Sequence, residues 1–260
     1  MTIEFYKYHG TGNDFILIDD RASSFPEKNH ELIRRLCERR FGIGADGLIL
    51  VRRHPDMDFS MVYFNSDGRE GSMCGNGGRC AVAFAFRLGI CGRATTFMAI
   101  DGTHVAKVVK PDHIQLKMQS VNDIRIKPDH YELDTGSPHY VTFVEKLQDM
   151  DVYALGRKIR QSNAFKAEGI NVNFVEQGKD SLSVRTYERG VENETWSCGT
   201  GVVATAICAA LKEQSEKSEY RIQTKGGELR ISFRKEKENE FRNIILEGPA
   251  EFVYQGTLEI

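Results

Sequence analysis

Two cysteines occupy equivalent positions in two glycine-containing motifs. Cys74 lies in MCGNGGRC, residues 73–80, and an apolar, alanine-rich segment follows it. Cys198 lies in SCGTG, residues 197–201, and the apolar segment VVATAICAAL follows it. Because small and apolar residues continue for more than two turns, both segments predict helices that are buried on most sides. Each cysteine should therefore stand at the start of a buried helix.

The start of a helix favours chemistry on an anion. Its first N–H groups have no partner within the helix and the helix dipole is positive there, which lowers the pKa of a thiol and binds a carboxylate. Most cysteines in apolar helices are core residues. We interpret four cysteines in that way: Cys37, Cys80, Cys91 and Cys208. Cys74 and Cys198 differ because glycine follows each of them, and glycine suits positions where the backbone approaches a ligand.

Two thiols beside one carbon atom can interconvert stereoisomers. A thiolate removes a proton from one face of the carbon, and a thiol returns a proton to the other face. The cysteine pair therefore predicts a racemase or an epimerase. A thiol sensor, in which residues 74 and 198 form a disulfide, is the alternative of another class. A sensor would not exchange a substrate α-hydrogen with deuterated water.

Composition limits the partners and the compartment. The 260 residues carry a formal charge of -2, so neither nucleic acid nor an anionic membrane is a favoured partner. No apolar run reaches the roughly 20 residues of a membrane span, and the N-terminal segment lacks the apolar region of a signal peptide. Six cysteines without a CxxC pair predict reduced thiols in a cytoplasmic protein. No metal site is predicted, because the C-x5-C spacing at residues 74–80 matches no usual zinc pattern.

The chain resembles itself at a shift of 124 residues, which is the separation of Cys74 and Cys198. The same shift aligns Tyr63 with Tyr187, and Gly102 with Gly226. This common register predicts a diverged duplication in which a central buried helix is wrapped by strands twice. A cleft between the halves would bring the two cysteines together, since small ligands often bind where domains meet.

Apolar periodicity predicts the remaining elements. The GxGxxG match at residues 42–47 follows a helix pattern and precedes a strand pattern, the reverse of a dinucleotide-binding loop, so we interpret it as a turn. Helices are expected at residues 31–40 and 151–161, and strands at residues 15–18, 139–144, 172–176, 182–187, 220–233 and 243–246.

Five segments of the chain closely resemble the diaminopimelate epimerase family. They are HGTGNDF (9–15), YFNSDG (63–68), MCGNGGRC (73–80), GINVNF (169–174) and YERGVENETWSCGTG (187–201). The resemblance implies an isomerase that needs no cofactor or metal and interconverts LL- and meso-2,6-diaminopimelate for lysine and peptidoglycan precursor biosynthesis. It also implies an α/β fold, with α+β-like mixed sheets, in two pseudo-symmetric domains that each wrap a mixed sheet around a central helix. We assign these domains to residues 1–119 with 250–260 and to residues 120–249, and we expect a homodimer.

The resemblance also implies roles for individual residues. Cys74 and Cys198 would be the acid–base pair, which His139 and Glu188 would assist in proton exchange. The substrate α-carboxylate would accept hydrogen bonds from backbone N–H groups of four residues: Gly75, Asn76, Gly199 and Thr200. The distal amino and carboxylate groups would bind a second set of side chains: Asn65, Asn171, Glu188 and Arg189. Asn13 would line the same cavity.

Each of these side chains also has an ordinary structural explanation. Glu188 and Arg189 could form an exposed pair, His139 could be a satisfied core residue, and Asn13 and Asn65 could be turn residues.

The chain departs from the family pattern at two positions. Ser137 stands where many members have asparagine before Pro-His, and Gly47 stands where some have glutamine. Either Ser137 makes a shorter hydrogen bond or recognition of the distal end is rearranged. Enzymes resembling proline racemase also use two cysteines, but the YERG motif and Asn65 favour a substrate with a charged far end. Isomerases of the phenazine-biosynthesis type lack the cysteine pair.

Overall fold

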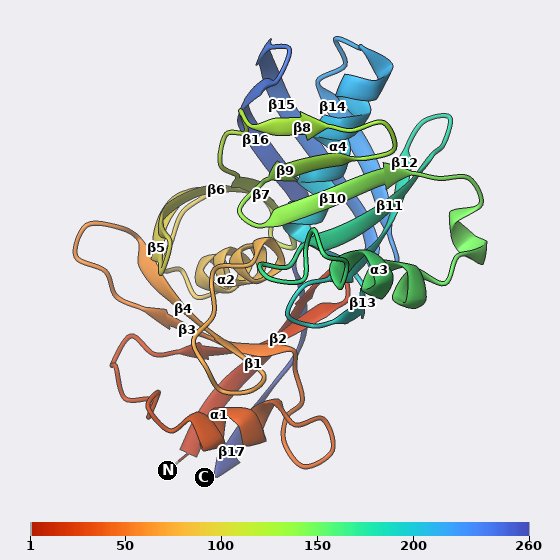
Figure 1. The fold of residues 1–260 in the computed structure, drawn as a ribbon. Coiled ribbons are helices and arrows are strands. Elements are labelled where there is room, and N and C mark those ends of the chain that lie inside the picture. The colour runs from red at the N-terminus through yellow and green to blue at the C-terminus, as the bar shows by residue number, and fades with distance from the viewer. Residues whose placement is uncertain (1, 260) are drawn as a thin grey trace. The chain divides into compact units, whose positions relative to one another are not determined.

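The computed structural model describes residues 2–259 and divides into two compact units, drawn as ribbons in Figure 1. Unit 1 comprises Met1–Leu116 and Gly248–Ile260, and unit 2 comprises Lys117–Glu247. None of the helices that residues 2–259 form is long and apolar enough to cross a membrane.

Unit 1 contains a mixed sheet. Its strands pair in the order β17 (Glu251–Glu259), β1 (Thr2–Gly10), β2 (Asn13–Asp19), β3 (Gly47–Arg52), β4 (Phe59–Asn65), β5 (Ala94–Ala99), β6 (Gly102–Lys110) and β7 (His113–Lys117). The pairs β2–β3 and β4–β5 are parallel, and the other pairs are antiparallel.

Helices pack on both faces of this sheet. Ile16 and Leu48 belong to the core beneath α1 (His30–Cys37), whereas Phe15 and Ile49 lie next to Gly77 of α2 (Gly75–Arg87). Because successive side chains of a strand point to opposite faces, β2 and β3 read as continuous apolar runs rather than alternating ones.

Helix α1 is shorter than the predicted helix at residues 31–40. Asn29 caps its start by accepting a hydrogen bond from the Leu32 N–H at 3.0 Å. At the other end the backbone of Glu38 is extended, and the loop that follows folds back, so that the N–H groups of Ile43 and Gly44 donate to the Leu36 carbonyl. The N–H groups of the loop thus bond to a carbonyl at the helix end, which would otherwise have bonded to the N–H groups of a further helical turn.

Unit 2 repeats this arrangement. Its sheet pairs β8 (Ile124–Ile126), β9 (Tyr131–Asp134), β10 (Pro138–Phe143), β11 (Asn171–Gln177), β12 (Leu182–Glu188), β14 (Glu219–Thr224), β15 (Gly227–Lys237) and β16 (Glu240–Pro249) in this order, with β13 (Asn193–Thr195) also on β12. The pairs β10–β11 and β12–β14 are parallel. The helical elements are η1 (Leu147–Asp149), α3 (Val152–Arg160) and α4 (Gly199–Glu213).

The two units share a strand register as well as an order of elements. Phe15 pairs with Gly47 in unit 1, and His139 pairs with Asn171 in unit 2, which reproduces the shift of 124 residues. Farther along, Gly102 opens β6 but Gly227 opens β15, so unit 2 has gained one residue by that point. The mixed sheets and shared topology confirm the predicted fold class.

The helices α2 and α4 are the central helices of their units. Residues 75–85 of α2 are all buried, and so are residues 201–210 of α4. Helix α4 contacts the strands β9, β10, β11, β12, β14 and β15, and Figure 1 shows it running among the strands of its unit. In α2, the absence of a side chain at Gly77 allows the helix to approach its sheet closely, since a Cβ there would lie only 3.3 Å from Ile49. Both predicted buried helices are confirmed.

Candidate active site

Cys74 is the N-cap residue of α2. Its backbone is extended, with φ of -106° and ψ of 137°, and its Sγ lies 3.5 Å from the Gly77 N–H that donates to it. The sulfur thus occupies the place that a serine or aspartate oxygen takes at other helix starts. Gly75 and Asn76 contribute the first N–H groups of the helix at the same end, where the dipole favours a negative charge.

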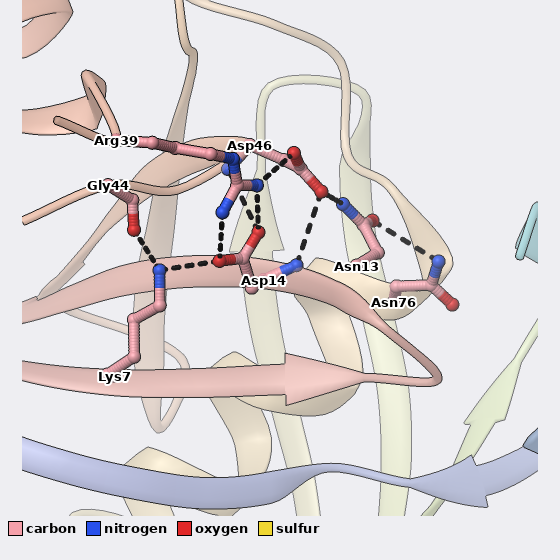
Figure 2. A network of polar contacts seen from close by, with 7 residues as sticks. All are labelled: Lys7, Asn13, Asp14, Arg39, Gly44, Asp46 and Asn76. Atoms are coloured by element: carbon pink, nitrogen blue, oxygen red, sulfur yellow. Dashed lines mark hydrogen bonds and ion pairs between the residues drawn. The ribbon is translucent and has the colours of Figure 1, made fainter. Parts of the chain in front are cut away.

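Asn13, at the start of β2, faces this cysteine. Its Oδ1 lies 3.6 Å from Cys74 Sγ and 3.2 Å from Asn76 Nδ2. Its Nδ2 donates to Asp46 Oδ2 at 2.8 Å, as Figure 2 shows. A carboxylate only accepts, so Asp46 fixes which end of the amide points at the thiol.

A network of charged side chains supports Asn13 (Figure 2). Arg39 donates to Asp46 at 2.7 Å and to both oxygens of Asp14 at 2.7 and 3.0 Å. The buried Lys7 ammonium lies 2.6 Å from Asp14 and also donates to the Gly44 carbonyl. Burial raises the pKa of the Asp14 carboxyl, but the hydrogen bonds from Arg39 and Lys7 outweigh this effect and lower it to about 2. The Asp14 carboxyl therefore stays ionised at neutral pH.

Arg79 places a cation inside unit 1. Its side chain is completely buried, and it donates to the Gly75 carbonyl at 3.1 Å, to Asn76 Oδ1 at 3.0 Å and to the Pro249 carbonyl at 3.3 Å. Burial lowers the pKa of the guanidinium, and the thiols of Cys80 and Cys74 act in the opposite direction. This charge favours an anion at the start of α2. Arg79 was not among the predicted site residues, although its signal is visible in the sequence, because it is the one charged residue between positions 75 and 86.

Cys198 is the N-cap residue of α4 and is 7% exposed. Its Sγ lies 3.5 Å from Thr200 Oγ1, which lies 2.9 Å from His139 Nε2. Burial of the ring, and secondarily the charge of Arg189, lower the pKa of His139 to about 3, so the imidazole is neutral at physiological pH. Three of the predicted residues thus meet at the start of this helix.

Asn171, Ser137 and Arg189 form a second group in unit 2. Asn171 Nδ2 donates to Ser137 Oγ at 2.8 Å, and Asn171 Oδ1 accepts from the Arg189 N–H at 2.9 Å. Arg189 Nη2 also donates to Ser137 Oγ, at 3.2 Å. Ser137 therefore holds together two residues that are predicted to bind the distal end. Glu188, the next residue, accepts from Thr195 Oγ1 at 2.8 Å.

Asn65 lies at the end of a strand and the start of a turn. It ends β4 opposite Gly47, and its N–H and carbonyl bond with Arg69 and Gly68 in the turn that follows. A Cβ at Gly71 would lie 2.8 Å from Asn65 Nδ2, so the missing side chain of Gly71 makes room for the amide.

The family model of diaminopimelate epimerase matches residues 5–122 and 131–253. The chain belongs to the diaminopimelate epimerase family. A diaminopimelate epimerase of Flavobacterium psychrophilum is 51% identical over 257 residues, covering 98% of this chain and 100% of the relative. One of Chlorobaculum tepidum is 44% identical over 262 residues, covering 96% and 99%. Family membership makes the chain an isomerase of the epimerase type.

Solved structures share the fold at low sequence identity. A Bacillus anthracis phenazine biosynthesis protein of the PhzF family has a TM-score of 0.81 at 13% identity, with 100% of both chains covered. A probable proline racemase from Agrobacterium radiobacter has a TM-score of 0.71 at 15% identity, covering 99% of this chain and 92% of the other. These likenesses establish the architecture, whereas the activity follows from the closer relatives.

Proposed function

We propose that this chain interconverts LL- and meso-2,6-diaminopimelate by a two-base mechanism that uses no cofactor, in lysine and peptidoglycan precursor biosynthesis. Family membership supports the reaction. The observation that carries the mechanism is the pair of equivalent central helices, α2 and α4, each with a cysteine at its N-cap. In this proposal the two cysteines face one substrate α-carbon.

In the reaction, the thiolate of one cysteine takes the α-proton and becomes a thiol. The electrons of the broken C–H bond pass into the adjacent carboxylate. The thiol of the other cysteine then gives its proton to the opposite face of the carbon and becomes a thiolate. The product leaves with inverted configuration, and the cysteines have exchanged protonation states.

The growing negative charge on the carboxylate needs stabilisation when no cofactor accepts electrons. The N–H groups of Gly75, Asn76, Gly199 and Thr200 would supply it, since donors fixed at a helix start need no reorganisation during the reaction. The buried cation of Arg79 adds to this effect in unit 1. His139 and Glu188 would assist proton exchange by the cysteines.

Recognition of the distal end would use Asn65, Asn171, Glu188 and Arg189, with Asn13 in the same cavity. Arginine suits the distal carboxylate because its planar fork matches two oxygens, and Glu188 suits the ammonium group. Ser137 Oγ accepts hydrogen bonds from Asn171 Nδ2 and Arg189 Nη2. These bonds support the alternative in which Ser137 makes a shorter hydrogen bond where many family members have asparagine, rather than the one in which recognition of the distal end is rearranged.

Three further features belong to this proposal. The catalytic domains are residues 1–119 with 250–260 and residues 120–249. The enzyme works in the cytoplasm, without nucleic acid or membrane partners. It also forms a homodimer, for which β17 offers a suitable surface, because its side chains Val253 and Tyr254 are exposed.

Deuterium exchange tests the proposal. Purified protein incubated with LL- or meso-diaminopimelate in deuterated water should place deuterium at the α-carbon with no added cofactor, whereas proline should remain unlabelled. Cys74→Ala and Cys198→Ala should abolish epimerisation, and the matched control Cys91→Ala should keep it. Normal turnover in either of the first two variants would refute the two-base assignment.

A further inference from the structure

Asn173 of β11 is a completely buried amide in unit 2. Its Nδ2 donates to the Tyr140 carbonyl at 3.0 Å, and its Oδ1 accepts from Thr186 Oγ1 at 2.9 Å. Because a backbone carbonyl can only accept, the amide has a single satisfactory orientation, with its nitrogen towards β10. The side chain is therefore a donor of fixed direction.

The same nitrogen lies 3.1 Å from His139 Nδ1. An amide nitrogen has no acceptor capacity, so Nδ1 of the imidazole must accept and cannot carry a proton. The ring is neutral, since burial lowers the pKa of His139 to about 3. A neutral imidazole has one N–H group, and that group must be at Nε2.

The position of this proton decides what Thr200 does. His139 Nε2–H donates to Thr200 Oγ1 at 2.9 Å, which leaves the hydroxyl hydrogen of Thr200 available for Cys198 Sγ at 3.5 Å. In the opposite tautomer Nε2 would accept, and the hydroxyl hydrogen would point at the ring rather than at the sulfur. Thr135 Oγ1 holds the backbone of Thr200 by donating to its carbonyl at 2.8 Å.

Gly201 makes this close packing possible. A Cβ at this position would lie 2.5 Å from Asn173 Oδ1 and 3.4 Å from Cys198 Sγ. The Asn173 amide and the Cys198 thiol thus both lie beside position 201, where any residue other than glycine would collide with the amide.

We propose that Asn173 is a positioning residue of the Cys198 half of the site, which fixes His139 as the Nε2–H tautomer and thereby directs the Thr200 hydroxyl to donate to the Cys198 sulfur. The inference rests on the proposed function for the catalytic role of Cys198. It assigns a role to Asn173, which the resemblance to the family did not single out, and it makes the action of His139 indirect. The hydroxyl stabilises the thiolate that removes the α-proton.

The tautomer can be measured on the unmodified protein. In 15N nuclear magnetic resonance of histidine-labelled protein, His139 should show a protonated Nε2 and a pyridine-type, unprotonated Nδ1. The variant Asn173→Asp puts an acceptor beside Nδ1 and should move the proton to that nitrogen. A protonated Nδ1 in the unmodified protein would overturn the proposal, whether or not Asn173→Asp folds.

The hydroxyl can be tested by thiol reactivity in a Cys74→Ser background. Thr200→Val removes the donor but keeps the side-chain shape and the backbone N–H, and it should slow alkylation of Cys198 at neutral pH by about tenfold. Thr200→Ser restores the donor and should restore most of the rate. Equal rates in the valine and serine variants would overturn the proposal. Neither measurement needs substrate, so a protein that passes both tests but fails to label diaminopimelate would refute the proposed function alone.

Discussion

The ion pair of Lys7 and Asp14 allows a quantitative test of the network beside Cys74. Lys7 Nζ lies 2.6 Å from Asp14 Oδ2, and the two side chains are 8% and 16% exposed. Burial alone would raise the pKa of Asp14, but Arg39 and Lys7 lower it from 3.8 to about 2. At about 1.4 kcal/mol for each pKa unit, the network favours the ionised carboxylate by roughly 2 kcal/mol.

A double-mutant cycle with Lys7→Met and Asp14→Asn isolates the share of the ion pair. Arg39 also bonds to Asp14, and the carboxylate keeps some contact with solvent, so we assign about half of the total, ~1 kcal/mol, to the coupling. Each single variant should cost more, about 2–3 kcal/mol, because Asp14→Asn takes the counter-ion from the buried Lys7 ammonium, and Lys7→Met leaves the largely buried Asp14 carboxylate with Arg39 alone. Urea unfolding at pH 7 gives all four free energies of unfolding.

The coupling should also depend on pH with a defined sign. The folded-state pKa of Asp14 is lowered, so the stabilisation is complete above about pH 4 and is lost as the pH falls towards 2. The exposed pair of Glu31 and Arg34 on α1 serves as the control, for which we expect a much smaller coupling at pH 7. A Lys7–Asp14 coupling no larger than this control, or one that increases below pH 4, would refute the reasoning.

Three other perturbations follow from single positions. Arg79→Met should destabilise unit 1 by about 2–4 kcal/mol in urea unfolding, because carbonyls in the core lose their donors; unchanged stability would contradict this. Gly156→Ala should lower the melting temperature, because the added Cβ would collide with Tyr187. We expect the collision to destabilise the protein by about 1–3 kcal/mol, against a gain of about 1 kcal/mol from the higher helix propensity of alanine. Ala154→Gly in the same helix is the control. His139 should show no titration between pH 5 and 8 by nuclear magnetic resonance. Because its pKa is lower in the folded state, the free energy of unfolding should fall as the pH drops from 6.5 towards 3. The variant His139→Gln should remove this pH dependence.

Local patterns in the sequence predicted the central helices well. The apolar segments after Cys74 and Cys198 have no other stable arrangement than burial, and a shift of 124 residues in the sequence corresponds to the shared register of the strand pairs. The predicted bounds of the outer helix at residues 31–40 were wrong at its end. That end depends on the loop folding back onto Leu36, which no helix pattern encodes.

The charged network could not be predicted in the same way. Lys7 shares the buried face of β1 with Ile3 and Phe5, where lysine is ordinarily rare, and its partner Asp14 stands on the next strand. Asn173 was missed for a related reason. It sits between Val172 and Phe174 in an apolar strand, and only the pairing of β10 with β11 brings it to His139. Contacts that depend on how two strands pair cannot be predicted from the sequence of either strand alone.

The two units differ in the groups that lie beside their N-cap cysteines. At the shift of 124 residues, Asn76 corresponds to Thr200 and Arg79 corresponds to Val203. Unit 1 therefore places a buried cation near its thiol, whereas unit 2 has an apolar side chain at that position and aligns a neutral chain of hydrogen bonds from Asn173 through His139 to Thr200. A cation stabilises a thiolate over a longer range than a single hydroxyl dipole does. This difference is compatible with the proposed reaction, because LL- and meso-diaminopimelate are diastereomers, and a catalyst for their interconversion needs two competent bases but not two identical ones.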